Sequence, residues 1–525
     1  MSTGFHFDAA KLDALFAAHN RSDQPGLAVG IAHRGRPLYR RGFGLASVEL
    51  PAVLTPSTRL RVASVTKHFC ALAVMLLAED GKLAIDDSIR RHLSDLPAWA
   101  EPITLAQLMS HTSGMRCSID ALFFLNGAAG RPVPGDAQHQ MLRRLRSVNF
   151  APGTDFLYCN GGYTLLTELV EHVSGQPFGD FLRERVLEPV GMHDSLMRAD
   201  DEACLANSAT LHVANVGGGF DKGRSGSRHD GAGGLVSTVD DMLGWMAHLR
   251  QPHVGSAQSW ATMRTPARLA NGANTGYGFG LMSGQYRGLN VLHHSGGVIG
   301  GASQMIQVLD HDLDIVILAN SSHIDPSGLA DQVIDACISG LPPAAQAATV
   351  AIEGDFLDAD TGRLMRLQQH DGASFVEING ARSPLKRRAD GALWCRANPS
   401  LGATLEAAAD GQSLLWQEHG RRVPLPRVQA PAGDQARAPE GRYCVPDFAL
   451  KAELAHDGEH TRLDLHGPHG TMNFKLEARA PDAWACTHTH PLLPAGALLQ
   501  RRGKALTLTT PRTRHLHLQR EPHDG

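Results

Sequence analysis

The stretch Ser64-Val65-Thr66-Lys67 runs into Phe69-Cys70-Ala71-Leu72-Ala73-Val74-Met75-Leu76-Leu77-Ala78, an apolar segment of helical length that stops near Gly81. Residues three positions apart share one face of a helix, so the Lys67 amine is expected to reach the Ser64 hydroxyl. A serine needs a base beside it to act as a nucleophile, and lysine is a base once burial or the helix N-terminus loosens its proton. Taken alone, such a pattern more often means that Ser64 caps the helix and Lys67 lies in solvent.

A second candidate stretch is centred on Tyr158 and Asn160. These residues follow a Pro-Gly turn at 152–153 and precede a segment of helical periodicity at 164–173. They are therefore expected on a loop between elements, where site residues gather. The alternatives are a turn or capping role for Asn160 and a core position for Tyr158 with its hydroxyl satisfied.

A third stretch, His294-Ser295-Gly296, precedes two apolar strands predicted at 303–308 and 315–319. A glycine at a strand lets another backbone or a substrate approach closely. The alternative is a tight bulge with an incidental histidine.

In this order and at these separations, the three stretches resemble the Ser-x-x-Lys, Tyr-x-Asn and His-x-Gly motifs of the penicillin-recognising serine hydrolases. That family includes beta-lactamases, penicillin-binding proteins, related esterases and D-stereospecific aminopeptidases. Two further stretches match it: His111-Thr112-Ser113-Gly114 after a helix predicted at 104–109, and Gly231-Ala232-Gly233-Gly234-Leu235-Val236-Ser237-Thr238 before a helix starting at Asp240.

The resemblance implies a mechanism in which Ser64 attacks a carbonyl and forms an acyl-enzyme. Lys67 and Tyr158 would share the proton transfers, and which of them takes the first proton stays open. The backbone N–H groups of Ser64 and Gly297 would form the oxyanion hole. Asn160 would orient the substrate amide.

His294 stands where penicillin-binding members of the family carry a lysine. A lysine supplies a fixed positive charge for a substrate carboxylate, whereas histidine is largely neutral at pH 7. The replacement therefore favours esterase and aminopeptidase activities over penicillin or D-alanyl-D-alanine recognition. His294 is counted among the catalytic residues together with Ser64, Lys67 and Tyr158.

At 525 residues the chain is too long for one domain of this fold. We expect an α+β catalytic domain at 1–342, in which an antiparallel sheet begins with a hairpin across Arg34-Gly35 and is flanked by helices. Short alternating strands then predict two small antiparallel β-barrel domains at 343–430 and 431–525. The two halves of this tail read as weak copies: Gly354 corresponds to Gly441, and Trp394 to Trp484.

A catalytic domain followed by two β domains resembles the three-domain D-aminopeptidases. In that subfamily a loop of the last domain reaches the active site and helps select substrates with a free amino terminus. The corresponding stretch here is 467–477, with Asn473 where the subfamily has an acidic residue. Asparagine accepts a hydrogen bond from an amine but lacks the charge that strengthens it, so a requirement for a free α-amine stays open. A plain hairpin tip is the alternative for this stretch.

Three functions follow as hypotheses. The first is an aminopeptidase that releases N-terminal D-amino acids from peptides, amides or esters through an acyl-enzyme on Ser64. The second is a beta-lactamase-related esterase or D-Ala-D-Ala carboxypeptidase. The third, of another class, is a non-catalytic binding or scaffold protein, against which the retention of all three motifs argues.

The composition of the chain limits the kinds of partner it is expected to bind and the cellular compartment in which it is expected. The eight cysteines include no Cys-x-x-Cys pair and are expected as buried free thiols, and the 28 histidines show no zinc-like spacing, so neither a metal nor a cofactor is expected. The net charge of −4 is spread along the chain, which argues against nucleic acid and membrane partners. We expect a cytoplasmic homodimer that binds a small peptide or amide substrate.

Overall fold

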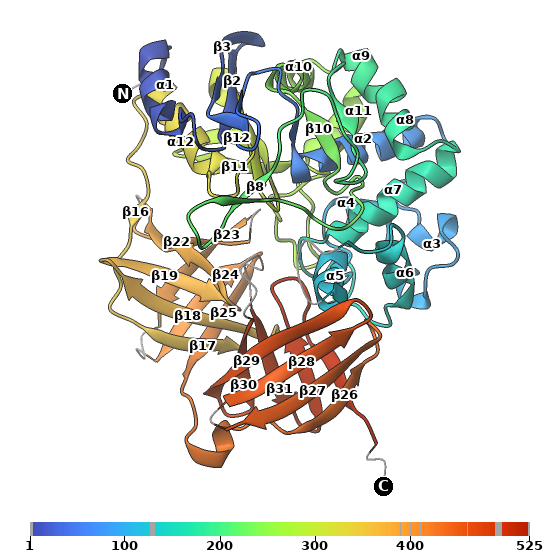
Figure 1. Cartoon of the computed structure of the whole chain (residues 1–525), viewed down its shortest axis with the longest axis vertical. Helices are drawn as coiled ribbons and strands as arrows, with labels where there is room; N and C mark the ends of the chain where they lie inside the picture. The colour runs from blue at the N-terminus through green and yellow to red at the C-terminus, as the bar shows by residue number, and fades with distance from the viewer. Residues whose placement is uncertain are drawn as a thin grey trace.

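The computed structural model describes residues 4–126, 132–388, 390–398, 401–408, 412–458, 460–488 and 496–522. A helix-rich part with its own sheet occupies the upper half of the molecule, and two β-sheet parts lie below it (Figure 1). The helix-rich part ends with helix α12 and the short strand β15, and the strands of the two lower parts follow in chain order.

The helix-rich part is built on an antiparallel sheet of six strands in the order β11-β12-β13-β14-β2-β3. The predicted hairpin across Arg34-Gly35 and the predicted strands at 303–308 and 315–319 are confirmed. Every residue of β14 is buried, because this central strand is covered on both faces. The strands span Leu27–His33 (β2), Arg36–Phe43 (β3), Met282–Tyr286 (β11), Leu289–Val298 (β12), Gly301–Val308 (β13) and Leu313–Ala319 (β14).

The two faces of the sheet belong to different hydrophobic clusters. Ile315 and Ile317 pack with helices α1 (Ala9–Phe16) and α12 (Pro326–Cys337), whereas Val316 and Leu318 pack with α2 (Thr66–Glu79) and α10 (Val239–Arg250). This alternation follows from the two-residue period of a strand. Helix α2 is apolar nearly all round and therefore lies in the interior.

Smaller elements complete this part. The remaining helices are α3 Ile89–His92, α4 Leu105–Met109, α5 Ser118–Asn126, α6 Ala137–Arg144, α7 Asn160–Ser174, α8 Phe178–Leu182, α9 Glu188–Val190 and α11 Ala257–Arg264. The short strands are β1 Gly4–Phe5, β4 Leu45–Ser47, β5 Ala52–Val53, β6 Leu60–Arg61, β7 Leu196–Met197, β8 His212–Ala214, β9 Phe220–Lys222, β10 Leu235–Ser237 and β15 Ile338–Ser339.

The first lower part is a sheet of ten strands in the order β16-β21-β22-β23-β24-β25-β17-β18-β19-β20. Its core is formed by the inward-facing residues of these strands, among them Phe356 and Trp416. The strands span Gln346–Ala347 (β16), Gly354–Asp358 (β17), Arg363–His370 (β18), Ala373–Ile378 (β19), Ala381–Pro384 (β20), Lys386–Arg387 (β21), Leu393–Asn398 (β22), Leu401–Ala407 (β23), Ser413–Glu418 (β24) and Arg421–Val428 (β25).

The second lower part is a closed barrel that runs from β26 to β33 in chain order. Closure leaves no sheet edge with unpaired backbone groups. Its strands span Gly441–Val445 (β26), Leu450–Asp457 (β27), His460–Gly467 (β28), Gly470–Ala480 (β29), Ala483–His488 (β30), Ala497–Arg502 (β31), Ala505–Thr509 (β32) and Leu516–Arg520 (β33).

The two lower parts repeat one arrangement. In each, a strand that opens with a glycine pairs with both the next strand and the last: β17 with β18 and β25, and β26 with β27 and β33. Gly354 and Gly441, the first residues of β17 and β26, have φ of +136° and +146°. The α+β fold class with two β-barrel-like parts is therefore confirmed, whereas the division at residues 342 and 430 stays a prediction.

The stretch 467–477 differs from the expected active-site loop. It comprises the turn from Gly467 to Gly470 and the first eight of the eleven residues of strand β29. The turn lies against the end of α5: the His469 N–H donates to the Leu125 carbonyl at 3.2 Å, and a Cβ on Gly467 would lie 2.3 Å from that oxygen.

Candidate active site

Ser64 lies where a short 3₁₀ turn at Ala63–Val65 leads into helix α2. The residue before it, Ala63, has φ of +51°, a left-handed conformation that costs free energy and is found at functional sites. Lys67 is on the first turn of α2, and its Nζ lies 3.1 Å from Ser64 Oγ. The predicted proximity of these two side chains is therefore present.

The Lys67 side chain is completely buried. Besides Ser64, its Nζ contacts Asn160 Oδ1 at 2.7 Å and the Ala232 carbonyl at 2.5 Å. Burial lowers the pKa of Lys67 to about 7, although Asp230 opposes the shift. A large fraction of this lysine is therefore a neutral amine at physiological pH.

Asn160 is the first residue of helix α7, so the helix begins four residues earlier than the sequence predicts. The reason lies in Gly161 and Gly162, which the sequence suggests as turn residues. A Cβ on Gly161 would lie 3.1 Å from Leu142 and Met115, and one on Gly162 would lie 3.3 Å from the Leu108 carbonyl. These glycines allow close helix packing, which brings Asn160 to Lys67.

Tyr158 is buried, and among the residues that the structure describes its hydroxyl makes no hydrogen bond. Burial raises the pKa of Tyr158 well above its usual range, while the neighbouring Ser64 and Arg512 pull it back. The Lys67 Nζ lies 4.9 Å from the centre of the Tyr158 ring. His111 fixes the segment before α7, since the Cys159 N–H donates to His111 Nδ1 at 3.2 Å.

His294 lies on strand β12 and is 1% exposed. Its Nδ1 is 2.6 Å from the Ser295 carbonyl, which only a protonated nitrogen can bond, and its Nε2 is 3.0 Å from the Tyr277 hydroxyl. Burial and the charge of Lys67 hold the pKa of His294 well below its usual range. The histidine is therefore neutral, and both of its nitrogens have partners within the protein.

Two glycines of β12 contact the nucleophile region differently. A Cβ on Gly296 would lie 2.4 Å from the Val62 carbonyl and 3.0 Å from Ala63 Cβ, so glycine is required for β12 to approach the turn before Ser64. A Cβ on Gly297 would meet no atom within 4 Å. Gly297 lines the cavity in front of Ser64.

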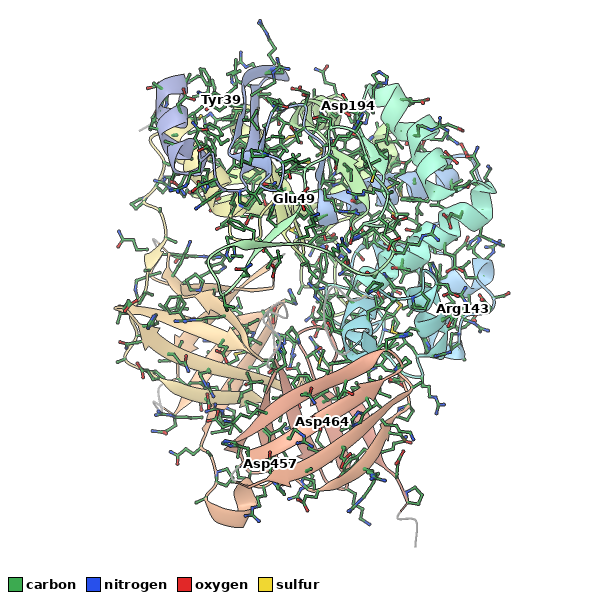
Figure 2. The ribbon with its side chains drawn as sticks, viewed as in Figure 1. Tyr39, Glu49, Arg143, Asp194, Asp457 and Asp464 are labelled. Carbon is green, nitrogen blue, oxygen red and sulfur yellow. The ribbon has the colours of Figure 1, made fainter. Side chains whose placement is uncertain are left out.

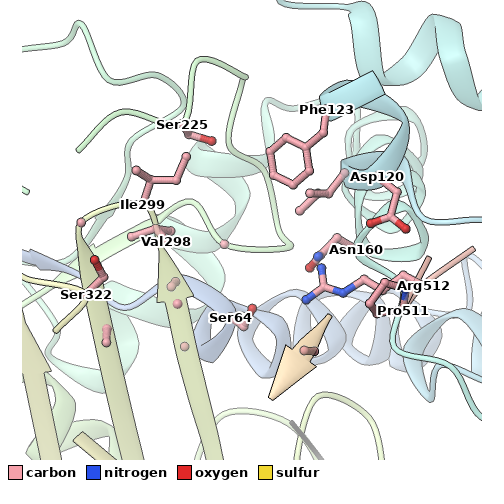
Figure 3. A pocket seen from close by; sticks show the side chains of 18 of the residues that line it. Ser64, Asp120, Phe123, Asn160, Ser225, Val298, Ile299, Ser322, Pro511 and Arg512 are labelled. Carbon is pink, nitrogen blue, oxygen red and sulfur yellow. The ribbon is translucent and has the colours of Figure 1, made fainter. Parts of the chain in front are cut away.

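The cavity has a volume of about 1360 Å³ and is lined by all three parts of the molecule. Five of the predicted site residues line it: Ser64, Tyr158, Asn160, His294 and Gly297. Figure 3 shows Ser64 and Asn160 on its floor with Arg512 reaching in beside them. The first β part contributes Arg363, Ile378 and Ala381, and the barrel contributes Met472, Phe474, His488, Gly496, Ala497, Thr510, Pro511 and Arg512.

Asn473 is the predicted site residue that lies elsewhere. It is exposed on β29, and its Nδ2 donates to Asp464 Oδ1 at 2.7 Å. Asp464, which Figure 2 labels, lies on the neighbouring strand β28. Successive residues of a strand point to opposite faces, so Met472 and Phe474 line the cavity while Asn473 does not. The expected contact between Asn473 and a substrate amine stays a prediction, which this orientation of the side chain does not support.

A different segment of the barrel brings a charged side chain to the cavity. It is the loop between β32 and β33, which carries Arg512. Sequence reasoning missed this arginine, because nothing distinguishes it among the 49 lysines and arginines of the chain. Tyr277, in the glycine-rich stretch Gly276-Tyr277-Gly278-Phe279-Gly280, was also missed.

Within the described ranges, no group of three or more His, Cys, Asp and Glu side chains is arranged to hold a metal ion. No helix in the same ranges is long and apolar enough to cross a membrane. Six of the eight cysteines are buried, and all eight are free thiols.

Several known proteins are similar to this chain in sequence or in structure. A protein named D-aminopeptidase from Brucella melitensis biotype 1 is 27% identical over 467 residues, which cover 88% of this chain and 87% of that protein. The octameric penicillin-binding protein homologue from Pyrococcus abyssi superposes with a TM-score of 0.57 at 20% identity, covering 98% of this chain and 100% of that chain. The D-amino acid amidase from Ochrobactrum anthropi SV3, complexed with D-phenylalanine, gives 0.53 at 23% identity over 62% of this chain and 98% of that chain.

The family model described as Beta-lactamase matches residues 12–338, which is more than half of the chain. The prediction that the chain is an enzyme, a serine hydrolase, is confirmed. The protein belongs to the beta-lactamase family.

Proposed function

We propose that the protein is an aminopeptidase that releases N-terminal D-amino acids from short peptides, amides or esters through an acyl-enzyme on Ser64. The observation that carries this proposal is the buried Lys67 amine at 3.1 Å from Ser64 Oγ. The relative named D-aminopeptidase, which aligns with most of the chain, supports the substrate class.

The geometry is compatible with Lys67 as the base. A neutral amine has two N–H groups and one lone pair. When Asn160 and the Ala232 carbonyl accept the two N–H groups, the lone pair faces the Ser64 hydroxyl. Ser64 Oγ would then attack the substrate carbonyl while its proton moves to Lys67.

Later steps need a proton on the leaving nitrogen and a site for the oxyanion. Tyr158, with its buried and unbonded hydroxyl beside Ser64, is positioned to relay the proton from Lys67 to the departing amine. The N–H groups of Ser64 and Gly297 are proposed to hold the oxyanion. Water then hydrolyses the acyl-enzyme and restores Ser64. The order in which Lys67 and Tyr158 act stays open.

The test is hydrolysis of D- and L-alanine p-nitroanilide by the purified protein and by Ser64→Ala. We expect turnover of the D substrate, a clear preference over the L substrate, and a loss of roughly 10³-fold or more in kcat for Ser64→Ala. Ser322→Ala is the matched control, because this exposed serine lines the same cavity (Figure 3). A fluorophosphonate should label Ser64 in the wild type.

Different failures have different meanings. Turnover of p-nitrophenyl acetate without turnover of D-alanine p-nitroanilide would replace the proposal by an esterase. Unchanged activity in Ser64→Ala would remove the mechanism altogether. If the protein hydrolyses none of these substrates and the fluorophosphonate does not label Ser64, the hypothesis of a non-catalytic scaffold protein remains. Hydrolysis of N-acetyl-D-alanine p-nitroanilide tests whether the substrate needs a free amine. This test does not rely on a role for Asn473.

The assembly and the cytoplasmic location stay predictions. The Pyrococcus abyssi relative is described as octameric, and the homodimer expected for this chain is tested by light scattering of the purified protein.

A further inference from the structure

Arg512 places a guanidinium in the cavity next to the proposed nucleophile. Its Cζ lies 5.7 Å from the centre of the Tyr158 ring, and in Figure 3 the guanidinium points from the barrel loop toward Asn160 and Ser64. Burial alone would lower the pKa of Arg512. The nearby Cys117 and Asp120 side chains outweigh burial and raise this pKa. The side chain is thus a permanent cation within the active site.

The loop that carries Arg512 is fixed by the helix-rich part. The Asn149 side chain donates to the Arg512 carbonyl at 3.2 Å and accepts the Arg514 N–H at 2.9 Å. Arg116 Nη1 donates to the Arg514 carbonyl at 2.6 Å. These contacts hold the loop backbone at Arg512 and Arg514, so the guanidinium is positioned before any substrate arrives.

Arg512 keeps donors for a ligand. Among the described residues, none of the side-chain ion pairs within 4.0 Å includes Arg512. Its neighbour Asp120 accepts hydrogen bonds from the hydroxyls of Thr510 and Thr513, which belong to the same loop. Arg512 also lines the cavity, where it remains partly exposed.

The position of Arg512 relative to the reaction identifies the ligand. Tyr158 is proposed to protonate the leaving nitrogen, so the leaving residue lies on the Tyr158 side of Ser64, where Arg512 is. The carboxyl carbon of an amino acid is only about 2.5 Å from its nitrogen. Arginine binds a carboxylate with two parallel hydrogen bonds, which the neutral and fully bonded His294 cannot do.

We propose that Arg512 binds the free carboxylate of the residue that follows the scissile bond. Resting on the proposed function, this inference makes dipeptides with an N-terminal D-residue and an ionised C-terminus the preferred substrates. The carboxylate is thus recognised by a barrel arginine instead of a residue on β12.

The test compares D-alanyl-glycine with D-alanyl-glycinamide, which differ only in the terminal charge. We expect the wild type to have the higher kcat/KM on the acid. In Arg512→Gln the ratio of the two kcat/KM values should fall roughly 10- to 100-fold, the usual worth of hydrogen bonds to a charged group. Arg512 also lowers the pKa of Lys67, but this effect is common to both substrates and cancels in the ratio.

Two further variants serve as controls. Arg228→Gln removes a positive charge from the exposed rim of the same cavity and should leave the ratio unchanged. Arg512→Lys keeps the positive charge but lacks the planar guanidinium, so it should retain part of the preference for the acid. If Arg512→Gln does not fold, the ratio of the two kcat/KM values measured in Arg512→Lys tests the inference in its place. A ratio near one in the wild type, or an equal fall in Arg228→Gln, would overturn the inference.

If the wild type cleaves neither dipeptide, the proposed function fails, and the carboxylate site is decided by protection. D-alanyl-glycine should then slow fluorophosphonate labelling of Ser64 more than the glycinamide does, in the wild type but not in Arg512→Gln. Equal protection by the two compounds would overturn the carboxylate site.

Discussion

At the scale of single residues, the chemistry depends on the protonation of Lys67. Its three contacts would suit an ammonium ion as well as an amine, so geometry alone does not fix the charge. Burial decides it, because the lysine is excluded from water. Asp230 favours the ammonium form and Arg512 the amine, so these two residues tune the base from opposite directions.

Reaction of Ser64 should therefore increase with pH through about 7, where Lys67 loses its proton. The measurement is the second-order rate of labelling by a fluorophosphonate, which has no titratable group of its own. Below the midpoint the rate should fall about tenfold per pH unit. Lys67→Arg should be unreactive across the range, since arginine keeps its proton. A rate that stays constant between pH 6 and 9, or a reactive Lys67→Arg, would contradict Lys67 as the base.

The residues of the site differ in how far the sequence predicts them. Ser64 and Lys67 belong to one helical turn, and Tyr158 and Asn160 to one short segment, so local spacing suffices to find them. Arg512 reaches the site from the other end of the chain through the packing of the barrel against the helix-rich part. A single sequence carries no signal for such a contact.

At the scale of elements, glycines and strand periodicity explain where prediction succeeded and failed. The resemblance to the three-domain D-aminopeptidases predicted that 467–477 is an active-site loop, and a hairpin tip was the alternative. Yet Met472, Phe474 and Leu476 alternate with polar residues, which is the pattern of a half-buried strand. Read this way, the sequence would have placed Asn473 on the outer face. The helix start at Asn160 had no such signal, because Gly161 and Gly162 serve packing there.

Gly296→Ala should disturb β12 where it approaches the turn before Ser64. The added Cβ would lie 2.4 Å from the Val62 carbonyl, a backbone atom that cannot rotate away. Overpacking of this kind costs about 1–3 kcal/mol, so we expect a thermal unfolding midpoint lower by several degrees. Gly297→Ala is the matched control, since its Cβ meets no atom within 4 Å and the midpoint should not change. Equal midpoints for both variants would show that β12 does not need this close approach.

At the scale of the whole molecule, Asp155 joins the three parts close to the active site. Its Oδ2 accepts a hydrogen bond from Arg514 of the barrel at 2.7 Å, and its Oδ1 lies 3.6 Å from His419 in the turn after β24. The residue lies in the same segment before α7 as Tyr158, so contacts between the parts help to position the site. Burial alone would raise the pKa of Asp155, but His419 and Arg514 outweigh it and hold the pKa well below its usual range.

A carboxyl whose pKa is lower in the folded than in the unfolded protein stabilises the fold above its unfolded pKa, about 4 for aspartate. That contribution disappears as the pH falls further toward the folded pKa. Asp155→Asn should therefore destabilise the protein at pH 7 by about 3–5 kcal/mol, the usual cost of leaving a buried partner such as Arg514 unpaired. The difference from the wild type should shrink below pH 4, as measured by urea unfolding across pH.

Glu406→Gln is the control for Asp155→Asn. It breaks the Arg422–Glu406 ion pair, whose side chains are 61% and 59% exposed, and should cost no more than about 1 kcal/mol. Because Asp155 lies three positions before Tyr158, its variant should also lose fluorophosphonate labelling at temperatures where Glu406→Gln is unaffected. If Asp155→Asn loses no more stability than Glu406→Gln, or loses it equally at every pH, then the barrels are held to the catalytic part by apolar packing and not by this junction.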